Sequence, residues 1–330
     1  MWSISGKYVL GRVLHGIPII LAIVVVNFFL IRLAPGDAAQ VLAGESGAET
    51  EDYLNQIREQ FGLNQPLWRQ FLAYMKNLLT FDLGYSFRHG REISGLIFER
   101  LGATMLLMGA TMTLSLTVGV VLGTIAAIRD RTFLGHVISV LSIVVYATPL
   151  FWVGLILIIV FSLRLGWFPT SGMITVGVPM TGPQAVIDIL HHLVLPSVAL
   201  SGFYMALYVR LMRSSMLETL GQDFIKTAHS KGLSDRKIVV RHALRNAIIP
   251  VLTMAGVQVS AMLGGSVIIE SVFGWPGLGM LAYEALFARD LNLLLGIFFL
   301  SSILVVLTNA VVDVIYTLVD PRISLARAKS

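Results

Sequence analysis

Six apolar runs, each long enough to cross a bilayer as a helix, constrain the fold of this chain more than any other feature. A helical span needs roughly 20 residues to cross about 30 Å of hydrocarbon. The runs lack the alternation of barrel strands, so helices are the expected spanning form. With 56% hydrophobic and 13% charged residues, the composition excludes an ordinary soluble domain. We predict an all-α integral membrane protein with six transmembrane helices, over residues 13–33, 101–128, 137–163, 193–211, 248–269 and 291–318.

The placement of Lys and Arg predicts which side of the membrane each loop occupies. Six spans put both termini on one side, and fifteen of the 24 basic residues fall in segments on that side. Seven of the other nine lie in the loop 32–100, and long loops cross membranes largely regardless of charge. The remaining ratio of fifteen to two predicts cytoplasmic termini and a cytoplasmic loop between spans four and five. The pI near 9.6 therefore reflects topology, and we expect no nucleic-acid partner.

We expect three parts: a tail and first span (1–33), an extracytoplasmic helical insertion (34–100) and a five-helix membrane core (101–330). The first span follows Lys7 and Arg12, so a signal peptide is an alternative. Its apolar core is longer than the ~7–15 residues of a signal peptide, and no clear small-x-small cleavage site follows it. We interpret it as a retained anchor.

Prolines inside the apolar runs include Pro149, Pro196 and Pro250. Proline removes a backbone hydrogen bond from a helix and clashes with the preceding turn. In a membrane, a neighbouring helix can satisfy the carbonyl that is left over. We therefore expect a kink or a helix start at each of these positions.

The insertion 34–100 contains two amphipathic helical patterns. Residues 49–62 place Leu54, Ile57 and Phe61 on one face and end at Gly62. Residues 64–84 have a proline near the helix start, followed by apolar residues at helical spacing: Pro66, then Leu67, Phe71, Tyr74, Met75 and Leu78. Such helices would either cap the bundle at the membrane surface or form a docking surface for a soluble partner or a second permease chain.

No motif in the chain carries catalysis or nucleotide binding. It lacks a G-x-x-x-x-G-K-[ST] phosphate loop, an H-E-x-x-H motif and a G-x-S-x-G motif, and it has no cysteine. The adjacent His191 and His192 point about 100° apart on a helix, which disfavours a metal pair. We expect no catalytic, cofactor-binding or metal site in this chain.

Polar residues inside the sixth run are the next feature of interest. Asn309 and Asp313 lie one helical turn apart, and a charge within a bilayer usually faces protein or water. They would line a translocation path or fill the interior of the bundle, where Asp313 would pair with an arginine such as Arg210. Glu270 lies near the other face with no relay between, which disfavours a proton-coupled carrier.

A dense polar segment interrupts the apolar chain between spans four and five, over about 212–247. The pattern predicts a helix continuing from the fourth span to Lys231, with Gly232 as a left-handed C-terminal cap. Ser234 would cap a second helix with Asp235 in its first turn, and that helix would run through Pro250 into the fifth span. The basic residues alone would suit an amphipathic helix on the membrane surface, but the sharp break also presents an exposed turn.

This hairpin resembles the "EAA" loop of ABC importer permeases. Lys226, Thr227 and Ala228, followed after three residues by Gly232, occupy the positions of Glu-Ala-Ala…Gly in the general pattern. The departures from that pattern resemble the dipeptide/oligopeptide/nickel branch of the family. Other stretches that are similar to this branch, and to its dipeptide-permease-B-like subunits, are "IRLAPGD", "FGLNQPLWRQF", "DLGYSF", "RSSMLE", "FGWPGLG" and "VDPRI".

The resemblance implies a permease subunit of the bacterial inner membrane that moves di- or oligopeptides by ATP-driven alternating access. Its coupling residues would be Lys226, Thr227, Ala228, Lys231, Gly232, Leu233 and Ser234, seated in a groove on an ATPase subunit. The implied partners are a second permease chain, two ATPase chains that hold ATP and Mg, a solute-binding protein and the lipid bilayer. The alternatives are a secondary transporter or channel, a membrane enzyme, or a permease for nickel, glutathione or another solute.

Overall fold

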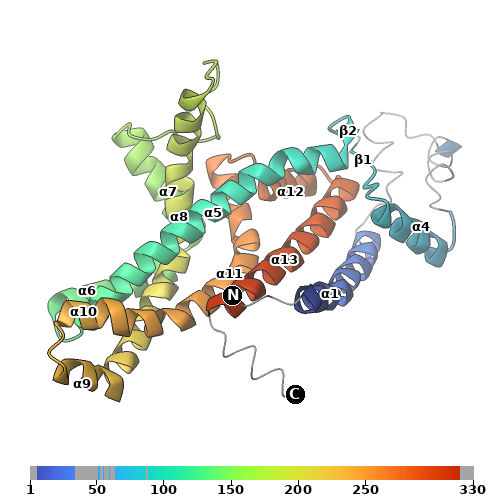
Figure 1. Cartoon of the computed structure of the whole chain (residues 1–330). Helices are drawn as coiled ribbons and strands as arrows, with labels where there is room; N and C mark the ends of the chain where they lie inside the picture. The colour runs from blue at the N-terminus through green and yellow to red at the C-terminus, as the bar shows by residue number, and fades with distance from the viewer. Residues whose placement is uncertain are drawn as a thin grey trace. The chain divides into compact units, whose positions relative to one another are not determined.

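A computed structural model describes residues 6–33, 51–52, 55, 59, 64–86 and 88–319. Side chains are described for residues 16–30 of the first range and, in the later ranges, as far as residue 312. Almost all of the described chain is helical, as predicted (Figure 1). It divides into two compact units, residues 1–102 with 280–307, and residues 103–279 with 308–330. The predicted helix over 49–62 lies mostly outside the described residues, as does the C-terminal tail.

The first unit combines the N-terminal part of the chain with residues 280–307. Its elements are α1 (Gly6–Leu33), α4 (Leu67–Leu79), β1 (Tyr85–Ser86), β2 (Arg91–Glu92), the start of α5 (Ile93–Ile128), most of α12 (Leu278–Phe287) and the first part of α13 (Leu291–Val319). Val24, Leu78 and Phe299 form its small core, so α4 packs on α1 and α13 (Figure 1). The predicted start of α4 after Pro66 is confirmed, because Pro66 is its N-cap.

Two very short strands were not predicted. β1 and β2 pair antiparallel, with Tyr85 opposite Glu92 and Ser86 opposite Arg91. The connecting turn contains Gly90 at φ +61°, a conformation that glycine adopts without strain. Ser86 donates to Asp290 Oδ2 at 2.5 Å, so the hairpin is bonded to the residue before α13.

The second unit is built around α8 (Pro183–Leu220). The other elements are α6 (Phe133–Ala147), α7 (Leu150–Leu157), a π-helical turn η1 (Ile158–Arg164), α9 (Asp223–Ser230), α10 (Asp235–Ile238), a second π turn η2 (Val239–Ala243) and α11 (Leu244–Phe273). α8 lies against α6, α7 and α11. Tyr208, Met212 and Met216 of α8 are completely buried, as expected for the central helix of a bundle.

The predicted third span is broken. Residues 137–163 were expected to form one span with a kink or a helix start at Pro149, and α6 ends at Ala147 and α7 starts at Leu150, with a bend of 105° between them. Pro149 explains the break, because the residue before a proline is driven out of the helical region, and Thr148 is extended at ψ 132°. The expectation of a helix start at Pro149 is confirmed, whereas Pro196 and Pro250 lie inside continuous helices.

Four described helices are long and apolar enough to cross a membrane, or five if the bent pair counts as one span. They are 93–128, 183–220, 235–273 and 291–312. The first three contain the predicted second, fourth and fifth runs, and the last covers most of the sixth, 291–318. The described apolar part of the first run, Gly16–Leu30, is shorter than these helices. The count of six and the cytoplasmic termini therefore stay predictions.

Candidate functional site

The polar segment 212–247 forms the expected hairpin, with one additional break. α8 ends at Leu220, and α9 starts at Asp223. The amides of Gly221 and Gln222 donate to carbonyls three residues earlier, and Gln222 is extended at ψ 151°. The prediction of one continuous helix as far as Lys231 is therefore wrong, because the chain turns at Gly221 before α9 begins.

The turn after α9 has the geometry that the sequence predicted. Gly232 adopts φ +75°, and its amide donates to His229 O at 2.9 Å. The Leu233 amide donates to Ala228 O at 3.4 Å, which satisfies a second carbonyl at the helix end. Ser234 is the N-cap of α10 in an extended conformation, although its hydroxyl makes no capping hydrogen bond. The helix that follows runs without a break from Asp235 to Phe273, passing through η2 and Pro250.

The hairpin has one face held in the core and one exposed face. Ile225 and Ala228 of α9 are buried with Ile238 of α10 in the main hydrophobic cluster, and Leu233 packs against that cluster. Ala228 therefore supports the hairpin from inside. The other residues assigned to coupling are exposed, namely Lys226, Thr227, Lys231, Gly232 and Ser234.

Two exposed apolar residues of the hairpin were missed by the sequence reasoning. Phe224, on α9, is 43% exposed, and Val240, on the second helix, is 58% exposed. Exposed aromatic residues beside polar ones are common at protein–protein interfaces. The available signal was Phe224 itself, because it lies in a stretch that is otherwise polar, beside Asp223, whose Oδ1 accepts from Lys226 Nζ at 2.8 Å.

Close packing between α5 and α8 supports the helix that leads into the hairpin. Gly119 and Gly123 form a G-x-x-x-G pattern on α5. A Cβ added to Gly119 would lie 2.7 Å from Tyr208 Cβ, and one added to Gly123 would lie 2.6 Å from Met212 Cβ and 2.7 Å from Val209 O. Only glycine permits this approach, which is the usual way that membrane helices pack closely.

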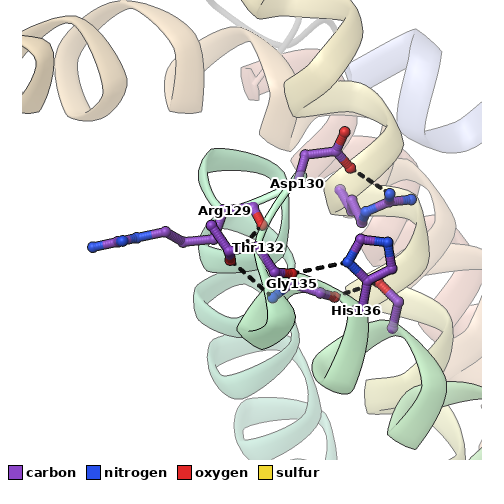
Figure 2. A network of polar contacts seen from close by, with 7 residues as sticks. Arg129, Asp130, Thr132, Gly135 and His136 are labelled. Carbon is purple, nitrogen blue, oxygen red and sulfur yellow. Dashed lines mark hydrogen bonds and ion pairs between the residues drawn. The ribbon is translucent and has the colours of Figure 1, made fainter.

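An ion pair joins α8 to the turn that follows α5. Arg213 Nη2 of α8 lies 2.5 Å from Asp130 Oδ1, in the turn between α5 and α6 (Figure 2). Within the turn, the hydroxyl of Thr132 donates to Arg129 O and accepts from the Gly135 amide. A Cβ on Gly135 would lie only 2.2 Å from Arg129 O, so the turn requires glycine there.

The polar residues of the last two long helices lie partly together. Ser260 of α11 donates to Asn309 Oδ1 of α13 at 2.7 Å, and Asn309 is exposed in this chain. Asp313 also lies on α13, but its side chain is outside the described part of the chain. Arg210, expected as a partner for Asp313, lies over the ring of Tyr146 at 4.5 Å.

Glu270, near the end of α11, is completely buried. Its Oε1 accepts from Thr104 Oγ1 at 2.8 Å, and the same hydroxyl accepts from the Leu278 amide. A Cβ on Gly277 would lie 2.4 Å from the carboxylate, and one on Gly279 would lie 2.6 Å from Val267 Cα. The glycines of "GWPGLG" thus allow the chain to close over the carboxylate. The Trp275 indole anchors this segment by donating to Ala103 O.

The two adjacent histidines have different partners, a loop carbonyl for His191 and a carbonyl of its own helix α8 for His192. His191 Nε2 lies 2.8 Å from Trp167 O, and His192 Nδ1 lies 2.8 Å from Asp188 O. The Asp188 carboxylate accepts from the amide and hydroxyl of Thr175 at 2.7 Å each, which fixes the 166–182 loop on the start of α8. Among the described residues, no group of three or more His, Asp or Glu is arranged to hold a metal ion.

Comparison with known families matches both parts of the chain. Residues 119–325 match the model of the binding-protein-dependent transport system inner membrane component, and residues 6–108 match the N-terminal model of the same kind of component. The chain belongs to this family. It is therefore an inner membrane component of an ABC transport system, as the sequence resemblance indicated.

Members of the family with similar sequences cover nearly the whole chain. A putative peptide permease of Brucella suis is 39% identical over 97% of this chain and 99% of its own length. The oligopeptide transport system permease AppB of Bacillus subtilis is 38% identical over 96% of this chain and 99% of its own. A probable peptide ABC transporter permease of Sinorhizobium fredii is 39% identical over a similar extent.

A solved structure supports the family fold. A chain from inward-facing crystals of the MetNI methionine ABC transporter superposes with a TM-score of 0.55, covering 69% of this chain and 97% of that chain. Sequence identity is 17%, so this likeness concerns the fold alone. The helical permease architecture expected from the sequence is confirmed.

Proposed function

We propose that this chain is the permease subunit of an importer for dipeptides or oligopeptides. The observation that carries the proposal is similarity along nearly the whole chain to permeases named for peptide transport. Such full-length similarity includes the hairpin, the buried Glu270 junction and the insertion between the first two long helices. The substrate path would open alternately to each side as ATP is bound and hydrolysed.

ATP hydrolysis would occur on separate cytoplasmic subunits, which would hold ATP and Mg. The hairpin supports this assignment, because Lys226, Thr227, Lys231 and Gly232 are exposed on a support of buried residues. Phe224 would add an apolar anchor to that face, since it is 43% exposed. Ala228 and Leu233 would keep α9 at a fixed angle while the exposed residues occupy the groove of an ATPase chain.

Asn309 would contribute to the translocation path. A polar side chain at an exposed position of an apolar helix is costly against lipid, so it is expected to face protein or water. Its Oδ1 accepts from Ser260, which leaves the amide donors oriented by that bond. Amide donors suit the carbonyl groups that peptide substrates present. A second permease chain and a solute-binding protein would complete the assembly.

Reconstitution tests the proposal. The chain should be co-purified with the permease, ATPase and binding-protein products of its own gene neighbourhood and placed in proteoliposomes. We expect ATP-dependent uptake of a labelled di- or oligopeptide, with no uptake of nickel or glutathione. Uptake driven by a pH step without ATP would overturn the ABC mechanism, whereas ATP-dependent uptake of another solute would overturn only the peptide assignment.

A further inference from the structure

Helix α4 has a wider apolar surface than its contacts in this chain cover. At 100° per residue, one stripe contains Phe71, Tyr74 and Leu78. A second stripe contains Trp68, Leu72 and Leu79, which fall within an arc of about 40° beside the first. The second stripe is exposed in this chain, at 59%, 58% and 78% respectively.

The first stripe packs on α1 and α13 within the same compact unit. Phe71 and Tyr74 place their rings 5.1 Å and 5.8 Å from the ring of Phe28 on α1. Leu78 is buried with Val24 of α1 and Phe299 of α13. This packing fixes the direction in which the exposed stripe points relative to α1.

The depth of these contacts argues against a water-soluble partner for the exposed stripe. At 1.5 Å per residue, Val24 lies about 13 Å along α1 from Leu33, and Phe299 lies about 12 Å along α13 from Leu291. Both positions are inside apolar runs that are predicted to cross the bilayer. A helix that packs at this level lies beside lipid rather than above the membrane.

The exposed surface of α1 around Phe28 is apolar, like the exposed stripe of α4. Val26, Phe29 and Leu30 flank Phe28 and are 53%, 50% and 55% exposed. The exposed polar face of α4, with Arg69 and Lys76, begins about 40° around the helix from Leu72, and Arg69 lies 5.1 Å from the ring of Trp68. A tryptophan beside a basic residue at the edge of an apolar face is typical of helices at a membrane interface.

We propose that α4 is an interfacial helix that lies in the leaflet at the Leu33 end of α1. Trp68, Leu72 and Leu79 contact acyl chains, while Arg69 and Lys76 face the headgroups and water. In the predicted topology this is the outer leaflet. The ligand of this surface is therefore lipid, and the inference stands apart from the identity of the transported solute.

Site-directed spin labelling tests the proposal, because the chain has no cysteine of its own. The variants are Leu72→Cys and Leu79→Cys on the exposed stripe and Lys76→Cys on the polar face as the matched control. Each is labelled with a nitroxide in the assembled transporter, with partner chains free of reactive cysteine. The complex is placed in vesicles of phosphatidylethanolamine and phosphatidylglycerol without binding protein.

We expect labels at positions 72 and 79 to collide more often with oxygen than with a water-soluble nickel chelate, and the label at 76 to show the reverse. Nickel accessibility at 72 and 79 equal to that at 76 would overturn the proposal, because the stripe would face water. Immobilised labels shielded from both reagents would also overturn it, because protein would cover the stripe. Both apolar positions are exposed, and they are tested independently, so failure of one variant to assemble leaves the other to decide.

Discussion

Asp130 and Arg213 lie 83 residues apart in sequence and 2.5 Å apart in space, where they join the turn after α5 to the helix that leads into the hairpin. Both side chains are more than one third exposed, at 37% and 38%. Exposed pairs contribute at most about 1 kcal/mol to stability. The pair is therefore better suited to fixing the orientation of α8 than to holding the fold together.

Reversing this ion pair should disturb transport more than stability. We expect Asp130→Arg or Arg213→Asp alone to lower the amount of substrate moved per ATP hydrolysed, because α8 loses its link to the α5–α6 turn. The double swap should restore much of that ratio. The exposed pair Arg91–Glu99 serves as control, since its reversal should leave the ratio unchanged. Equal losses in the single and double variants would show that the pairing itself is irrelevant.

The turn at Gly232 should tolerate asparagine but not proline. Asparagine enters the left-handed region at modest cost, whereas proline cannot adopt φ +75° and lacks the amide that donates to His229 O. Gly232→Asn should keep ATPase association and transport within a few-fold of wild type. Gly232→Pro should insert in the membrane yet lose association, measured by co-purification. Normal transport by Gly232→Pro would refute the coupling assignment.

Methyl groups at Gly277 or Gly279 should destabilise the junction around Glu270. An added Cβ would lie within 2.4–2.8 Å of the carboxylate or the Val267 backbone. Overpacking of this kind costs about 1–3 kcal/mol. We expect Gly277→Ala and Gly279→Ala to lower the thermal midpoint of the purified complex, whereas Gly109→Ala, with nothing within 4 Å, should not. Unchanged midpoints for all three variants would contradict the close packing.

Removing the hydroxyl of Tyr74 should be neutral or stabilising. Within the described residues, Tyr74 Oη is buried without a hydrogen-bond partner, and burial raises the pKa of Tyr74 to about 12. A tyrosine with a raised pKa favours the folded state below pH ~10, and that contribution falls as the pH rises toward 12. Tyr74→Phe should therefore gain thermal stability relative to wild type above pH 10. A larger alkaline loss in the Tyr74 variant would exclude this explanation.

Asp313 should support assembly and carry no protons. No relay of carboxylates connects it with Glu270 in the described helices, so uptake should require ATP and should persist when the proton gradient is collapsed. Asp313→Asn should keep most activity because the amide retains hydrogen-bonding capacity, whereas Asp313→Leu should reduce assembly if a buried partner is left unpaired. Uptake driven by a pH step alone would revive the secondary-transporter alternative.

Local chemistry explains which features the sequence predicted. The helix after Pro66, the left-handed Gly232 and the helix start at Pro149 depend on neighbouring residues alone. The angle of the bend after Thr148, 105°, depends also on the helices packed around it. The continuous apolar run therefore does not predict that angle. The pairing of Asp130 with Arg213 and the closure of Gly277 over Glu270 join distant parts of the chain, and a single sequence does not reveal such contacts.

The length of α8 has a mechanical consequence. At 1.5 Å per residue, its 38 residues form a rod about 57 Å long, which exceeds the thickness of a bilayer. Gly119 and Gly123 seat its second half on α5, while Asp188 near its start binds the loop at Thr175. A tilt of only about 5° around the middle of such a rod would move each end by roughly 2.5 Å in opposite directions. α8 thus has the proportions of a lever arm, in which a small angular change at the hairpin becomes a displacement of atomic size at the far loop.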